Sequence, residues 1–171
     1  MTHHHHSSPK EGVIAGLLGA GAVALLFLIR DVIQGVPFLT PSVLGQVITL
    51  GVSTPVTDRA LPGAVLAYTG LHLVVFIVFG LLLAGFVRVA TTQPSFRFAM
   101  VVLFIFFEFF FAGLAYMLHE STRALFPLGL VLFANLVAAI VMMTYLWRHH
   151  PALRRAVRRD PFGMGTSGGQ H

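Results

Sequence analysis

The sequence predicts an all-α integral membrane protein: an antiparallel four-transmembrane-helix bundle with a short interfacial helix in the first outer loop. Composition is the first observation behind this prediction, because the 171 residues are 56% hydrophobic and 10% charged, whereas soluble domains carry about 25% charged residues. Mean hydropathy is +0.84. The second observation is a set of four long apolar runs, and the third is a one-sided distribution of Lys and Arg around them.

The four apolar runs have the length of membrane spans, since a hydrocarbon layer about 30 Å thick needs about 20 apolar residues of helix. The predicted spans are about 12–30, 62–88, 97–119 and 124–148. They form a membrane domain, 12–148, between a polar N-terminal tail, 1–11, and a C-terminal tail, 149–171, that is basic and then flexible. Because short connections join the last three spans, these should be antiparallel neighbours.

The positive charges orient the spans. With both termini in the cytoplasm, eight Lys and Arg residues lie inside and three outside, which agrees with the excess of positive charge on cytoplasmic loops of membrane proteins. The inner set is Lys10, Arg88, Arg97, Arg148, Arg154, Arg155, Arg158 and Arg159, and the outer set is Arg30, Arg59 and Arg123. This topology accounts for the net charge of +5, so we expect no nucleic-acid partner.

Five arginines lie at or directly after the end of the last span: Arg148, Arg154, Arg155, Arg158 and Arg159. A basic residue near an anionic membrane surface is attracted by about 1 kcal/mol. We therefore expect these side chains to contact lipid headgroups, in addition to setting the topology.

The first outer loop contains a short helical pattern within PFLTPSVLGQVITLG, Pro37 to Gly51. Thr40 can cap a helix over about 41–50 that has Pro41 in its first position. An apolar stripe would consist of Val43, Leu44, Val47 and Ile48, with Ser42, Gln46 and Thr49 elsewhere. A helix this short cannot span a bilayer, so it should lie in the interface or cover the bundle, either as a shield for helix ends or as a functional lid.

One carboxyl group interrupts the third span. Glu108 lies in FIFFEFFFAG, at the eleventh of the 21 residues from Phe98 to Leu118, and an ionised carboxylate exposed to lipid at that depth is costly. It should therefore face other helices. The rest of the helix surface, which we expect to meet lipid, carries Phe106, Phe107, Phe109 and Phe110.

Two other polar residues fall at a similar depth. His72 and Asn135 lie near the middle of the second and fourth spans, so the sequence predicts a buried cluster of His72, Glu108 and Asn135. Tyr68, one turn from His72, and His119, on the helix face of Glu108, can extend it toward the outer side.

This cluster has three interpretations. Its residues can satisfy one another's hydrogen bonds, and such interhelical contacts contribute about 0.6 to 2 kcal/mol. They can instead hold a haem, a metal ion or a proton, or they can contact another subunit. A haem clamped by His72 and His119 of one chain is disfavoured, because His119 lies about 16 Å along the helix from the level of Glu108. Ligation by one histidine, or by His72 from two protomers, stays open.

The chain lacks the residues that several kinds of catalytic or metal site require. The chain has no cysteine, which excludes disulfides, thiolate-ligated Fe–S clusters, thioether-attached c-type haem and a cysteine nucleophile. A ferritin-like site needs Glu-x-x-His, but Phe111 follows Glu108 at that spacing. The zinc-hydrolase pattern stops after His119-Glu120, and no serine stands beside a histidine in a plausible triad at span depth. No catalytic residue is predicted.

Small residues mark one face of the first span. Gly12 and Gly16 form a GxxxG pattern, with Ala15, Gly19 and Ala20 nearby. Such residues allow close helix packing. We expect a neighbouring helix of the same chain there, in preference to another chain.

Four phrases occur together: PFLTPSVLG in the outer loop, LAYTGLH in the second span, FEFFF in the third, and ANLVAAIVMMTYLWRHHPALRR at the end of the fourth. With them, the chain resembles small four-span membrane proteins of bacteria that have no established activity. The likeness covers roughly Gly12 to Arg155. It implies a four-helix bundle in the bacterial inner membrane.

Two classes of function are consistent with these features. The first is a noncatalytic accessory or assembly subunit of a larger membrane complex, which would contact other membrane subunits or further copies of itself. The alternative is a stand-alone bundle whose buried cluster binds a haem, a metal ion or a proton. A quinone or lipid site between the outer helix and the ends of the spans is a further alternative.

Overall fold

The computed structural model describes residues 9–92, 95–117 and 126–149. These residues form helices and connecting loops, with no strand among them. The elements are α1 (Pro9–Ile33), α2 (Leu39–Leu44), the π-helical turn η1 (Gly45–Thr49), α3 (Pro62–Thr92), α4 (Ser95–Met117) and α6 (Leu128–His149). The all-α prediction is confirmed.

Three of the described helices, α1, α3 and α6, are long and apolar enough to cross a membrane. The third predicted span corresponds to α4, which has 23 residues and within which the apolar stretch is the shorter segment Val101–Gly113. The outward surface is itself apolar: Leu25, Leu66 and Phe109 are 58%, 73% and 74% exposed. A surface of this kind suits lipid as the surrounding solvent.

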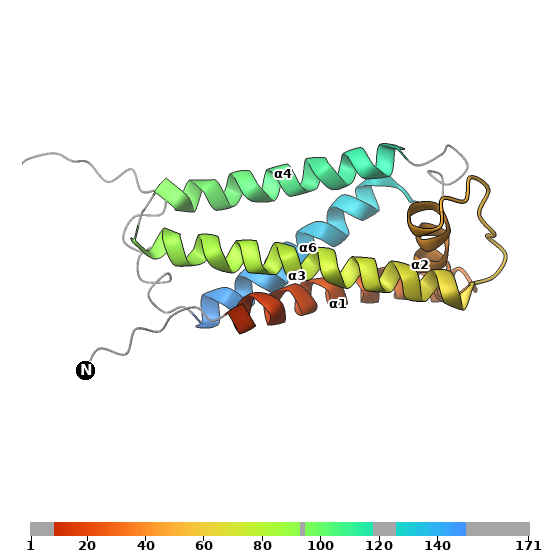
Figure 1. Cartoon of the computed structure of the whole chain (residues 1–171), viewed down its shortest axis with the longest axis horizontal. Helices are drawn as coiled ribbons and strands as arrows, with labels where there is room; N and C mark the ends of the chain where they lie inside the picture. Colours follow the sequence, from red (N-terminus) through yellow and green to blue (C-terminus); the bar gives the residue numbers. More distant parts are fainter. Residues whose placement is uncertain (1–8, 93–94, 118–125, 150–171) are drawn as a thin grey trace, which may run out of the picture.

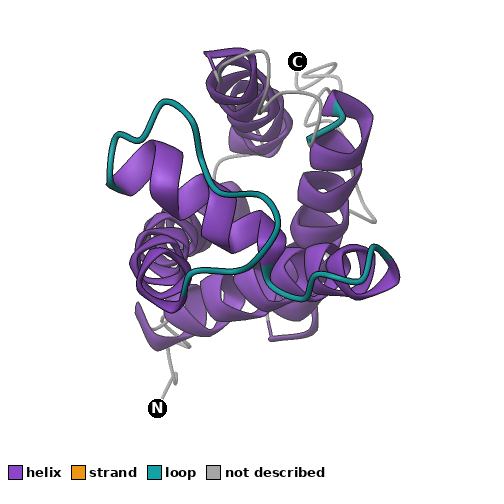
Figure 2. Cartoon of the chain, turned by 90° about the vertical axis from the view of Figure 1, so that its right-hand side faces the viewer, coloured by secondary structure: helices purple, strands orange, loops and turns teal. Residues whose placement is uncertain are grey.

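Figure 1 shows α1, α3 and α4 running roughly side by side and α6 crossing them at an angle, with each long helix running back along the one before it in the chain. Among the long helices, α1 makes the most contacts, with α3 and α6, while α4 makes fewer with the same two helices. α2 and η1 lie at one end. Figure 2 looks onto that end and shows them, with the loop that follows, lying across the long helices.

Glycine brings α1 and α3 into backbone contact. A Cβ atom added to Gly12 would lie 2.9 Å from the Cα of Leu81, and one added to Gly16 would lie 2.8 Å from the Cα of Ile77. Both distances are shorter than real Cβ contacts, so the helices can approach this closely only where a side chain is missing. The GxxxG face of the first span thus packs inside the chain, as predicted.

The aromatic surface of α4 differs from the prediction at one residue. Phe106, Phe109 and Phe110 are 69%, 74% and 57% exposed, but Phe107 is 8% exposed. Its ring stacks on Phe79 of α3, with centroids 3.9 Å apart. Phe107 is therefore a core residue at the α3–α4 contact, because α3 covers this side of α4.

The short helix at the bundle end begins earlier than predicted. Its first residue is Leu39, and it is preceded by Phe38, which has a positive φ of 63° and makes no side-chain cap. Thr40 is therefore inside the helix and is not its cap. Its backbone N–H and its hydroxyl both donate to Asp31, each at 2.6 Å, so a carboxylate from the end of α1 takes the place of a local cap.

Candidate functional site

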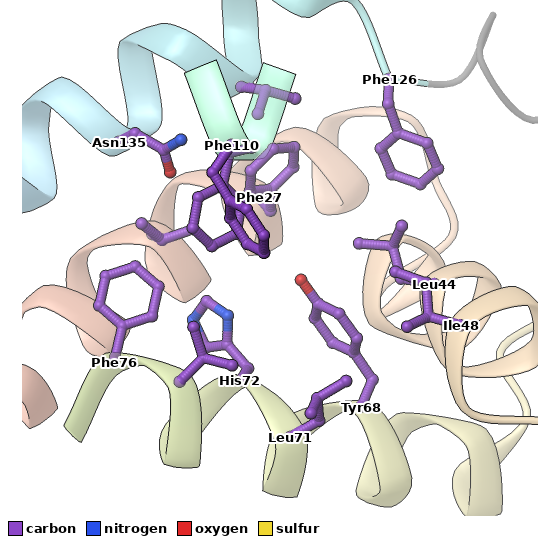
Figure 3. Close-up of a pocket in the computed structure, with 14 residues that line it drawn as sticks. Phe27, Leu44, Ile48, Tyr68, Leu71, His72, Phe76, Phe110, Phe126 and Asn135 are labelled. Carbon is purple, nitrogen blue, oxygen red and sulfur yellow. The ribbon is translucent and has the colours of Figure 1, made fainter. Parts of the chain in front are cut away.

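A cavity of about 260 Å³ lies inside the bundle near the α2 end (Figure 3). Every long helix contributes to its wall, and Leu44 of α2 and Ile48 of η1 cover it from the bundle end. Most lining residues are apolar. The polar exceptions are Tyr68 and His72 of α3 and Asn135 of α6.

The α3 wall is a short ladder of rings. Tyr68 stacks on His72 with centroids 5.6 Å apart, and His72 lies against Phe76 at 4.6 Å. Nε2 of His72 is 3.3 Å from the backbone oxygen of Ala20 in α1. Because a carbonyl oxygen only accepts, Nε2 carries the hydrogen, which leaves Nδ1 as an acceptor in the neutral ring.

The hydroxyl of Tyr68 points into the cavity (Figure 3). No hydrogen bond joins it to another residue in the described part of the chain. A phenol group both donates and accepts, so it can bond to a polar atom of a molecule inside the cavity.

The α6 wall is formed in part by Asn135, which is only 3% exposed. Its side chain reaches toward the cavity, with the carboxamide oxygen turned to the side of α3 (Figure 3). The carboxyl group of Glu108 on α4 lies near this side chain. Nevertheless, neither Glu108 oxygen nor the Asn135 nitrogen reaches a hydrogen bond within the described residues, although all three atoms are buried.

The three residues of the predicted cluster share one level of the bundle. Counted from the α2 end, His72 is ten residues from Pro62, Glu108 is nine from Met117 and Asn135 is seven from Leu128. At 1.5 Å per residue these offsets are about 15, 14 and 11 Å. The level therefore lies between the middle of α3, which is 31 residues long, and the end of α3 beside α2.

The structure brings together only part of this cluster. Asn135 and His72 line the same cavity, with Tyr68 beside them, whereas Glu108 lies next to Asn135 and is not among the lining residues. His72 bonds to the backbone of α1 instead of to Glu108. A ligand-binding role for these residues stays a prediction.

The other predicted site residues lie mostly beyond the described ranges. His119, Arg154, Arg155, Arg158 and Arg159 fall outside them, and Arg148 is exposed near the end of α6. Within residues 9–92, 95–117 and 126–149, no three His, Asp or Glu side chains gather in a group that could hold a metal ion.

Sequence reasoning missed the residues that hold α2 and η1 over the cavity. Ser42 and Gln46, placed outside the apolar stripe, are 0% and 2% exposed. The Gln46 side chain accepts from the Val56 N–H at 2.8 Å and donates to the Val56 oxygen at 3.2 Å, while Ser42 accepts from the Leu61 N–H at 2.9 Å. Their spacing of four residues was the available signal, since it places both on one helix face.

A second cavity, of about 370 Å³, lies between α1, α2 and α3. It shares part of its wall with the first cavity, namely Val23, Phe27, Tyr68 and His72. The two cavities therefore adjoin at those four side chains.

Comparison of the sequence with family models and with curated proteins, and of the fold with solved structures, finds no match. The resemblance to small bacterial four-span proteins stays a prediction.

Proposed function

We propose that the protein is a noncatalytic four-span bundle of the bacterial inner membrane that binds a small amphipathic molecule in the cavity beneath α2. Both termini are cytoplasmic in this proposal, and α2 with η1 lies at the outer interface. The observation that carries it is the composition of the cavity wall, in which Tyr68, His72 and Asn135 stand among apolar side chains.

This wall has the pattern of small-molecule sites, which are mostly apolar and contain a few placed polar groups. An empty apolar cavity of about 150 Å³ holds a benzene ring. A volume of about 260 Å³ therefore accommodates one ring with short substituents. The second cavity, which adjoins the first at Tyr68 and His72, offers room for a longer chain. A ring with an alkyl or prenyl tail, such as a benzoquinone or its reduced form, fits this description.

Native mass spectrometry of protein released gently from its own membrane tests the proposal. We expect a retained small molecule that disappears in Val131→Trp, because the larger side chain fills the cavity that Val131 lines. Leu136→Trp is the matched control on α6, since Leu136 is 44% exposed and outside the cavity wall. Absence of a retained molecule, or equal retention in both variants, would count against the proposal.

The second candidate function is that of an accessory or assembly subunit in a larger membrane complex. The outer face of α4 favours it, because Phe98, Phe106 and Phe109 are 64%, 69% and 74% exposed and aromatic residues are enriched in protein interfaces. Purification at low detergent distinguishes the two. A partner polypeptide lost on Phe106→Ala and Phe109→Ala would support the subunit role, whereas a lone chain in native membranes would contradict it.

A further inference from the structure

The unpaired polar atoms between α4 and α6 indicate which chemical groups a ligand of the cavity should carry. A buried hydrogen-bonding group without a partner costs about 1 to 3 kcal/mol, and most such groups in proteins are paired. Three stand together here: both oxygens of Glu108 and the amide nitrogen of Asn135. Asn135 belongs to this group and to the cavity wall at once.

The chemistry of the two side chains sets the orientation of the amide. In its carboxylate form Glu108 offers only acceptors, so the complementary atom of Asn135 is its nitrogen, which is a donor only. With the nitrogen on the side of Glu108, the oxygen is the atom that Asn135 turns toward the α3 side of the cavity, as Figure 3 shows. A carboxamide oxygen accepts hydrogen bonds and cannot donate them.

We propose that Asn135, positioned by Glu108, selects a ligand whose ring carries a hydroxyl group. This inference rests on the proposed function, and it adds the head-group chemistry. A hydroxyl donates to the Asn135 oxygen, whereas an ether or a quinone carbonyl at the same place puts two acceptors against each other. The preferred ligand is thus a phenol or hydroquinone, and Glu108 is a positioning residue that does not touch it.

Three probes of nearly equal size test this selection on the full chain in nanodiscs. They are para-butylphenol, its methyl ether para-butylanisole, and butylbenzene, with affinities measured by calorimetric titration. We expect the phenol to bind about tenfold more tightly than the ether, which corresponds to one net hydrogen bond. Butylbenzene reports on the cavity alone.

Substitutions then identify the residues that cause the preference for the phenol. Asn135→Leu keeps the side-chain size and should remove the preference for phenol over ether while butylbenzene still binds. In Glu108→Gln the new amide can pair with Asn135 in either orientation, so the preference should fall to about threefold or less. Val131→Ala is the control, because it enlarges the cavity without changing a polar group.

The outcomes separate the inference from the function on which it rests. Equal affinity for all three probes, unchanged in Asn135→Leu, would overturn the head-group selection and leave the cavity intact. A preference lost in Tyr68→Phe but kept in Asn135→Leu would overturn it as well, and would assign the hydroxyl to Tyr68. If no probe binds the wild-type chain, both the inference and the proposed function are wrong.

Discussion

Asp31 and Thr40 are joined by two hydrogen bonds of 2.6 Å, one from the backbone N–H of Thr40 and one from its hydroxyl. Asp31 is fully buried, and a guanidinium nitrogen of Arg30 lies 3.6 Å from one of its oxygens. The pair connects the end of α1 to the start of α2, which helps to cover the cavity. A side-chain contact over nine residues thus fixes the position of the cavity roof.

Removal of the Thr40 hydroxyl tests this connection. Thr40→Val keeps the side-chain shape and loses one hydrogen bond to a carboxylate, so we expect a loss of about 1.5 to 3 kcal/mol in unfolding free energy. Denaturant unfolding in detergent micelles measures the loss. Thr69→Val is a matched control, because that hydroxyl bonds only to the preceding turn of its own exposed helix surface. Equal effects of the two substitutions would contradict the role of Asp31.

The glycine contact between α1 and α3 predicts a position-dependent effect of one methyl group. Gly16→Ala places a Cβ against the backbone of Ile77 and should destabilise the bundle by about 1 to 3 kcal/mol. Gly21→Ala lies on the same helix with nothing within 4 Å, so it should be neutral or stabilising by up to about 1 kcal/mol. Thermal unfolding of the two variants measures this difference in stability. A Gly16→Ala protein as stable as Gly21→Ala would show that the helices are farther apart.

Gln46 is predicted to order the loop between η1 and α3. Its amide makes two hydrogen bonds to the backbone of Val56, and Gln46→Leu leaves both backbone groups without this partner. We expect faster amide hydrogen exchange in residues 50–61 and unchanged exchange in the middle of α3. Gln46→Glu retains the acceptor and loses the donor, so its effect should be intermediate. Unaltered exchange in the loop of Gln46→Leu would exclude this role.

The proposed topology can be tested with single cysteines, because the natural chain has none. Ser53→Cys lies in the loop after η1, and Arg148→Cys lies at the exposed end of α6. A membrane-impermeant maleimide should label Ser53→Cys in intact cells and Arg148→Cys only after lysis. Labelling in the reverse order would invert the topology, and labelling of both in intact cells would argue against four spans.

The helical membrane character could be predicted because it depends on local composition. Runs of apolar residues predicted α1, α3 and α6 closely, although α3 continues to Thr92, beyond the predicted boundary at 88. The inward position of Asn135 could also be predicted, since a carboxamide exposed to lipid is unfavourable. These inferences need no knowledge of which helix is the neighbour.

Other features depend on the neighbour and could not be predicted. Phe107 has the same side chain as Phe106, and only the approach of α3 makes it a core residue. His72 bonds to the α1 backbone at Ala20, a partner that residue type and depth do not specify. The burial of Asp31 could not be predicted, because this residue follows Arg30 at a span boundary, where exposed charges are common.

The central claim is that the cavity beneath α2 takes up a small ring-containing molecule, and photolabelling tests it most directly. A phenyl diazirine probe should label the α3 segment around Tyr68 and His72 and the α6 segment around Asn135, and excess para-butylphenol should suppress this labelling. Val131→Trp should lose it. Labelling confined to the exposed phenylalanines of α4, with no competition and no effect of Val131→Trp, would contradict the account.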